Sequence, residues 1–153
     1  MKTKYVIIAL CFFCSTFAFA QDKLFDKYAE MDNVTSVYIS KAMFQMIPNI
    51  ENVGLNLMNM KGKIESLQLV STEKTDQIPQ MRNDFTQLIN KQHQELMRVR
   101  DGKTRATFYA DMQGEKVKNL LMLADTDSSF TAIQLLGNFT LQDIQEIAKE
   151  MNK

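Results

Sequence analysis

Hydrophobic spacing in the first third of the chain changes from a helix period to a strand period. Apolar residues recur at helical spacing over residues 24–31, and a β-branched and aromatic run follows over residues 34–40. This pattern predicts a short helix that leads into a strand. Ser40 can cap a second helix, which Pro48 ends. Residues 49–62 mix Asn, Gly and apolar residues, and they predict a loop or a frayed helix.

The next segment predicts an interior strand and a long helix. Residues 63–70 alternate and carry apolar side chains on both faces, as a strand with two neighbours does. A helix is predicted after Thr75 and Asp76, with Pro79 in its first turn. Its apolar stripe has the i, i+3, i+4 and i+7 spacing of a buried helix face and consists of Ile78, Met81, Phe85, Leu88 and Ile89. We expect His93 to lie exposed near the end of this helix.

From residue 95 the hydrophobic period changes to two, and turn residues divide the rest of the chain. The pattern predicts strands at residues 95–100, 103–110, 117–124 and 130–136, which in this order form an antiparallel meander. Gly137 and Asn138 are expected to end the last strand. Thr140, with Asp143 three residues later, resembles a capping box for a closing helix.

The predicted order of elements is αβαβαββββα. Helices that gather before and after a block of antiparallel strands are typical of the α+β class. We therefore expect a two-layer single domain with a largely antiparallel sheet and helices packed on one face. The opposite sheet face would then be the working surface.

The first twenty residues have the three parts of a secretory signal peptide. Lys2 and Lys4 form the basic start, residues 5–13 form the apolar run, and Ala18 to Ala20 supply an Ala-x-Ala ending. A transmembrane anchor would need about 20 apolar residues, which this run lacks. We expect cleavage after Ala20, so that residues 1–20 are removed and residues 21–153 form one exported domain, in the periplasm and without a transmembrane anchor.

Both cysteines, Cys11 and Cys14, lie in the segment expected to be removed. The exported domain would then have no disulfide, no thiolate metal site and no cysteine nucleophile. With 45% hydrophobic and 24% charged residues, the composition is that of an ordinary globular domain. Stability in an oxidising compartment would therefore rest on its hydrophobic core.

Charge is balanced over the whole chain, with 18 basic and 18 acidic side chains. This balance argues against nucleic acid and against an anionic membrane as the partner. Glycine loops that cradle phosphates and the residue spacings of metal sites are absent from the sequence, so no cofactor and no metal are expected. A partner would have to be recognised by a local cluster of charge.

Such a cluster is predicted around Asp101 and Gly102. If these two residues form a tight turn, Arg100 pairs with Lys103 and Arg98 pairs with Arg105. All four basic side chains then share one sheet face, which Lys116 and Lys118 can extend from the next strand and Tyr109 can flank with an amphipathic contact. The cluster is either a solvated outer face balanced by acidic neighbours such as Glu95, Asp111 and Glu115, or a site for an anionic ligand or an acidic protein partner.

Two alternatives of other classes remain open. The first is a hydrolase, whose site would need His93, the single histidine of the chain. No serine has a nucleophile-elbow pattern around it. The second is copper(I) binding by the thioethers of Met43, Met46, Met58 and Met60. The alternative for these methionines is a structural role, as adaptable side chains in the core. We expect no catalytic residue and interpret the chain as a non-catalytic binding or accessory protein.

Several segments resemble an uncharacterised family of short exported Bacteroidetes proteins, known as a domain of unknown function. The similar segments span the exported chain and are residues 24–28, the VTSVYISKAM segment at residues 34–43, residues 95–107 and the ending at residues 135–144. The resemblance implies an exported single-domain protein of a Gram-negative bacterium. It supplies no activity, substrate or catalytic residue.

Overall fold

The computed structural model describes residues 16–46 and 62–151. Within these ranges the chain forms helices and a sheet in one α+β fold, which confirms the predicted fold class. The elements in chain order are α2 (Thr16–Ala29), β1 (Val34–Ser40), α3 (Lys41–Met46), β2 (Ile64–Thr72), α4 (Ile78–Gln87), β3 (His93–Asp101), β4 (Thr104–Gln113), β5 (Lys116–Asp125), β6 (Phe130–Thr140) and α5 (Leu141–Met151). The loop predicted over residues 49–62 lies almost wholly outside the described residues.

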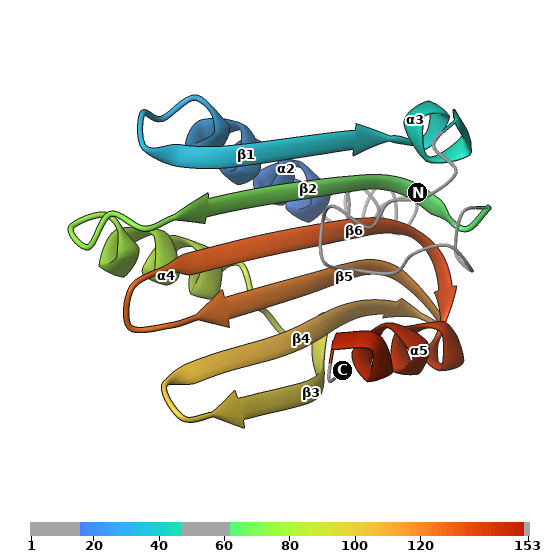
Figure 1. Ribbon diagram of the computed structural model, residues 1–153. Helices are drawn as coiled ribbons and strands as arrows, with labels where there is room; N and C mark the ends of the chain where they lie inside the picture. Colours follow the sequence, from blue (N-terminus) through green and yellow to red (C-terminus); the bar gives the residue numbers. More distant parts are fainter. Residues whose placement is uncertain (1–15, 47–61, 152–153) are drawn as a thin grey trace, which may run out of the picture.

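One antiparallel sheet contains all strands of the described residues, in the order β1-β2-β6-β5-β4-β3 (Figure 1). The four C-terminal strands are neighbours in chain order, as a meander requires. The meander is only part of the sheet, because β6 also pairs with β2 and thereby adds the β1–β2 pair. β2 is thus an interior strand, in agreement with its apolar residues on both faces.

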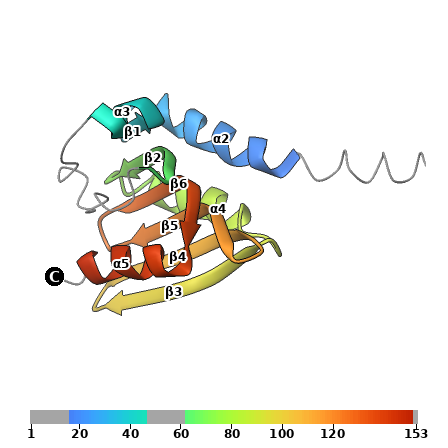
Figure 2. The same ribbon diagram turned by 90° about the vertical axis from the view of Figure 1, so that its right-hand side faces the viewer.

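Helices cover both faces of this sheet, so the expectation of two layers with all helices on one face is wrong. Helices α2 and α4 lie on one side of the sheet and α5 lies on the other (Figure 2). Two separate hydrophobic clusters result, one with α2 and α4 and one with α3 and α5. β5 and β6 accordingly bury apolar residues on both faces.

The cluster beneath α2 and α4 is built around the fully buried ring of Phe85. Its centroid lies 5.0 Å from that of Phe25, 5.6 Å from that of Tyr28 and 6.2 Å from that of Phe130, so that it connects α2, α4 and β6. Tyr28 also donates a 2.8 Å hydrogen bond to Asp84 of α4. The two helices are therefore fixed to one another as well as to the sheet.

On the other face, Phe44 of α3 and Ile144 of α5 are buried against the sheet. The predicted cap of α3 is confirmed, because the Ser40 hydroxyl accepts a hydrogen bond from the Met43 amide at 3.4 Å. The capping box of α5 is also confirmed. The Thr140 amide donates to Asp143 at 2.8 Å, and the Asp143 amide donates to Thr140 at 3.2 Å.

β6 continues past Gly137, where the sequence pattern had predicted its end. A Cβ at this position would lie 2.2 Å from the Lys63 carbonyl oxygen, so only glycine allows β2 to approach so closely. The Asn138 amide donates to the same carbonyl at 2.9 Å. The glycine therefore permits strand contact instead of ending the strand.

α4 ends at Gln87, earlier than its apolar stripe suggested, and β3 begins at His93. The expectation of an exposed histidine at a helix end is therefore wrong. No helix in residues 16–46 and 62–151 is long and apolar enough to cross a membrane.

Candidate functional site

The predicted basic cluster lies at the turn between β3 and β4. Asp101 pairs with Thr104, so the two central turn residues are Gly102 and Lys103. Gly102 has a φ of 57°, the positive value required at the first central position of a type II′ turn. The predicted pairing of Arg100 with Lys103 is therefore wrong, and the closing pair lies one residue further along each strand.

Three arginines still share one face of the sheet. Arg100 lies directly opposite Arg105, and Arg98 lies opposite Thr107. Side chains two residues apart on a strand point to the same face, so the corrected register keeps all three guanidinium groups together. Lys103 lies in the turn beside them.

The arginines lie on the face that carries α2 and α4. Arg105 is the register partner of Asp125, and Thr107 is the partner of Leu123, which belongs to the cluster beneath these two helices. The expected working surface opposite all helices does not exist, because α5 occupies the other face. The basic cluster is instead beside α4, over the outer strands β3 and β4.

Arg98 is paired with a carboxylate of its own strand. Its Nη2 lies 2.7 Å from Glu95 Oε2, although residues three apart in a regular strand point to opposite faces. Leu96 forms a bulge, which shifts the register between Glu95 and Met97 and brings the side chains of Glu95 and Arg98 to the same face. The hydrogen bond from Arg98 to Glu95 and the Glu95 charge both raise the pKa of Arg98.

Two further cations at the cluster are also paired. Arg82 of α4 binds both carboxylate oxygens of Asp125, at 2.6 and 2.7 Å, and this hydrogen-bonded contact raises the pKa of Arg82. Lys103 forms an ion pair with Asp127 in the turn between β5 and β6. These contacts hold the two turns and α4 around the arginines.

Arg100 and Arg105 form no ion pair with any residue in the described ranges. Both are exposed, and they are direct cross-strand neighbours. Like charges directly opposite one another destabilise a sheet. A guanidinium pair without a carboxylate partner is suited to a bidentate anion such as a carboxylate or a phosphate group.

The unpaired arginines border two hollows. One has a volume of about 250 Å³ and is lined by Arg98, Arg100, Arg105 and Thr107. The other is about 560 Å³ and is lined by Arg82, Arg100, Gly102, Lys103, Arg105, Asp125, Thr126 and Asp127. Arg100 and Arg105 line both hollows. We treat the two hollows as one site and call it the arginine hollow.

Other residues expected at this site are placed differently. Tyr109 is on the arginine face, but it is half-buried and packs against the cluster beneath α2 and α4. Lys116 pairs with Thr140 at the end of β5 remote from Asp125, and Lys118 donates to Asn138 at 3.2 Å. The expectation that these two lysines extend the basic cluster is therefore wrong.

Arg82 is the site residue that sequence reasoning missed. It is exposed on α4, between the buried positions Met81 and Phe85. Nothing in the helical pattern relates it to a hairpin some twenty residues later. Only the packing of α4 on the sheet brings it to the arginine hollow.

His93 belongs to a polar cluster on the same sheet face, beneath the start of α2. Gln21 Nε2 donates to His93 Nε2 at 2.9 Å, and His93 Nδ1 donates to Asn90 Oδ1 at 3.2 Å. Burial lowers the pKa of His93, and the charge of Asp111 opposes this only in part. In the described residues both ring nitrogens contact amide groups, and these contacts supply no nucleophile for a hydrolase.

Gln21 connects this cluster to two further strands. Its Oε1 accepts hydrogen bonds from Asn119 of β5 and, at 3.3 Å, from Gln134 of β6. No local pattern predicts this cluster, because Gln21, Asn119 and Gln134 are far apart along the chain. They are brought together only when α2 packs on the sheet.

Metal binding finds no support from the carboxylates and the imidazole that the structure describes, since no three of them come close enough to hold an ion. Met43 and Met46 of α3 are 48% and 77% exposed, so they are not core residues as the packing alternative assumed. Met58 and Met60 lie outside the described residues, and the copper hypothesis stays a prediction.

Comparisons with known proteins give one family and no characterised relative. No curated protein and no solved structure shows a significant match. The model of one protein family matches residues 28–147, a range that runs from α2 into α5 and includes every strand of the described sheet. The chain therefore belongs to the family described as a domain of unknown function, DUF4252.

Proposed function

We propose that this chain is an exported, non-catalytic binding protein that takes an anionic partner at the arginine hollow. The observation that carries the proposal is the pair Arg100 and Arg105, which face one another without a carboxylate partner among the described residues. A bound carboxylate or phosphate would relieve their repulsion and accept hydrogen bonds from both guanidinium groups. The export part rests on the signal-peptide pattern of residues 1–20.

The surrounding ion pairs support a preformed site. Arg82 with Asp125, Arg98 with Glu95, and Lys103 with Asp127 fix the neighbouring charges before any ligand arrives. Binding would then order few side chains, which keeps its entropic cost low.

Fluorescence polarisation with a labelled polyglutamate peptide tests the proposal. The double variant R100Q/R105Q should weaken binding about tenfold or more, because each lost charged hydrogen bond is worth about 1.5–3 kcal/mol. Added salt should weaken the parent complex as well. The matched control is K91Q/K116Q, which removes the same charge from exposed positions at the other end of the sheet.

Two results would contradict the proposal. One is equal binding by the parent protein and R100Q/R105Q, and the other is equal weakening by R100Q/R105Q and by the control. Denaturant unfolding of R100Q/R105Q accompanies the assay. Relief of the like-charge contact should leave its stability unchanged or raised, so lost binding would not stem from lost folding.

A further inference from the structure

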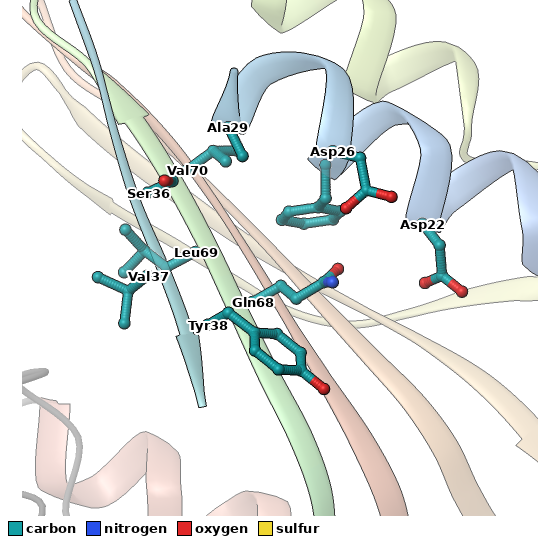
Figure 3. Close-up of a pocket in the computed structure, with 10 residues that line it drawn as sticks. Asp22, Asp26, Ala29, Ser36, Val37, Tyr38, Gln68, Leu69 and Val70 are labelled. Carbon is teal, nitrogen blue, oxygen red and sulfur yellow. The ribbon is translucent and has the colours of Figure 1, made fainter. Parts of the chain in front are cut away.

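A second cavity lies away from the arginine hollow, between α2 and the strand pair β1–β2. Its volume is about 410 Å³, within the range of pockets that hold small molecules. The residues that line it are Asp22, Phe25, Asp26 and Ala29 of α2, Ser36, Val37 and Tyr38 of β1, and Gln68, Leu69 and Val70 of β2. We call it the α2 cavity (Figure 3).

One wall of the α2 cavity carries two carboxylates. Asp22 and Asp26 are four residues apart on α2, which places them on the same helix face. Neither forms an ion pair with a residue in the described parts of the chain. Burial raises the pKa of Asp22, and the neighbouring Asp26 charge raises it further. The wall thus has negative charge that no side-chain cation in these ranges balances with an ion pair.

The opposite wall adds an independent acceptor. Gln68 extends from β2 on the side where α2 carries Asp22 and Asp26 (Figure 3). Its Oε1 is buried and has no hydrogen-bond partner among the residues of the described ranges. A buried acceptor without a donor is uncommon and costs free energy. Asp22, Asp26 and Gln68 therefore offer acceptor oxygens from the helix and from the sheet.

The rest of the cavity is apolar and aromatic. Phe25 and Val70 are buried beside it, whereas Tyr38 is 65% exposed at its edge. An exposed aromatic ring next to carboxylates can cover a ligand and contact a cation through its face. Ser36 is a small side chain on the same strand, and it leaves the cavity open.

We propose that the α2 cavity binds a small organic ammonium ion that carries a short apolar or aromatic body. The three hydrogens of a primary ammonium match the acceptors of Asp22, Asp26 and Gln68, and the apolar body packs against Phe25 and Val70. A divalent metal fits less well. Calcium needs six to eight oxygen ligands, and no three carboxylates or other metal-binding side chains of the described residues converge here.

Isothermal titration of the purified protein with 2-phenylethylamine tests this site. Binding should be saturable and should weaken about tenfold or more in D22N/D26N, through loss of charged hydrogen bonds. The uncharged analogue 2-phenylethanol should bind at least about tenfold more weakly than the amine, for the same reason. The matched control E30Q/D32N removes two charges just beyond the end of α2, from residues that do not line the cavity.

A second variant, Ser36→Leu, fills the cavity from an edge strand without changing any charge, and it should also abolish amine binding. The proposal is overturned if the alcohol binds as well as the amine, if calcium binds and the amine does not, or if E30Q/D32N loses as much affinity as D22N/D26N. Failure of the amine to bind the parent protein also overturns it. R100Q/R105Q should bind the amine normally, which separates this site from the arginine hollow.

Discussion

His93 is kept neutral by its surroundings at the start of β3. Its ring lies between Gln21 and Asn90, and burial lowers its pKa below the ordinary value, with Asp111 opposing this in part. Burial in an uncharged polar cluster favours the neutral imidazole, because the charged form would lose hydration. His93 is also the only histidine of the chain, so its titration has no counterpart elsewhere.

We predict that the protein loses stability as the pH falls from neutral through about 6.5, the ordinary histidine pKa. Below that value the unfolded chain binds a proton on His93 that the folded chain resists, so the free energy of unfolding decreases with falling pH. Urea unfolding at a series of pH values between 7.5 and 5.5 measures this slope. A His93→Gln variant should show a flatter profile, and an unchanged slope in that variant would contradict the assignment.

At the scale of single elements, α5 depends on the junction with β6. Thr140 ends the strand and its hydroxyl caps the helix, while Asp143 returns a hydrogen bond to the Thr140 amide. Asp143 also accepts a hydrogen bond from the Lys63 ammonium at 2.7 Å, and the two form an ion pair. Burial alone would raise the pKa of Asp143, but the hydrogen bonds from Lys63 and Thr140 lower it overall. The junction thus connects α5, β6 and the start of β2.

We predict that Thr140→Ala lowers the free energy of unfolding by about 0.5–2 kcal/mol, the usual cost of removing an N-cap hydroxyl. Thr140→Ser keeps the hydroxyl and should cost less. Denaturant unfolding of both variants provides the measurement, with Thr104→Ala as a control for loss of a threonine at an exposed strand position. Equal stability of the Ala and Ser variants would show that the cap does not hold α5.

At the scale of the whole molecule, the expected cleavage point lies inside a helix of the structure. α2 runs from Thr16 to Ala29 and so crosses the bond between Ala20 and Gln21, at which cleavage is expected. The Gln21 side chain is buried and contacts β3, β5 and β6. These contacts would hold the new chain end on the sheet after the leader is removed.

We predict that the protein recovered from the cell envelope begins at Gln21. The Ala-x-Ala ending and the apolar run before it are the physical basis, since they match what a signal peptidase recognises. Intact-mass measurement of the exported protein tests this. Retention of Met1, or an acylated cysteine at the new N-terminus, would contradict it.

Local interactions explain most of what could be predicted. The α+β class, the strand at residues 34–40 and the caps at Ser40 and Thr140 follow from periodicity and from hydrogen bonds between residues three apart. The shared face of Arg98, Arg100 and Arg105 is also local, because it depends on alternation along two strands joined by one turn. The register of this hairpin was predicted wrongly, because the sequence pattern places the turn at Asp101 and Gly102, one residue too early.

The amino-acid sequence by itself determined the hydrophobic period of each segment, which residues are apolar and which arginines can share a face. The tertiary structure decided that β6 lies beside β2 and that helices cover both faces. It also brought Arg82 to the arginine hollow, Gln21 to His93 and Asp22 to the α2 cavity. The reason is that these contacts join residues distant in sequence. Their partners are set by which apolar faces bury one another, and hydrophobic attraction is not directional enough to specify a partner from a local pattern.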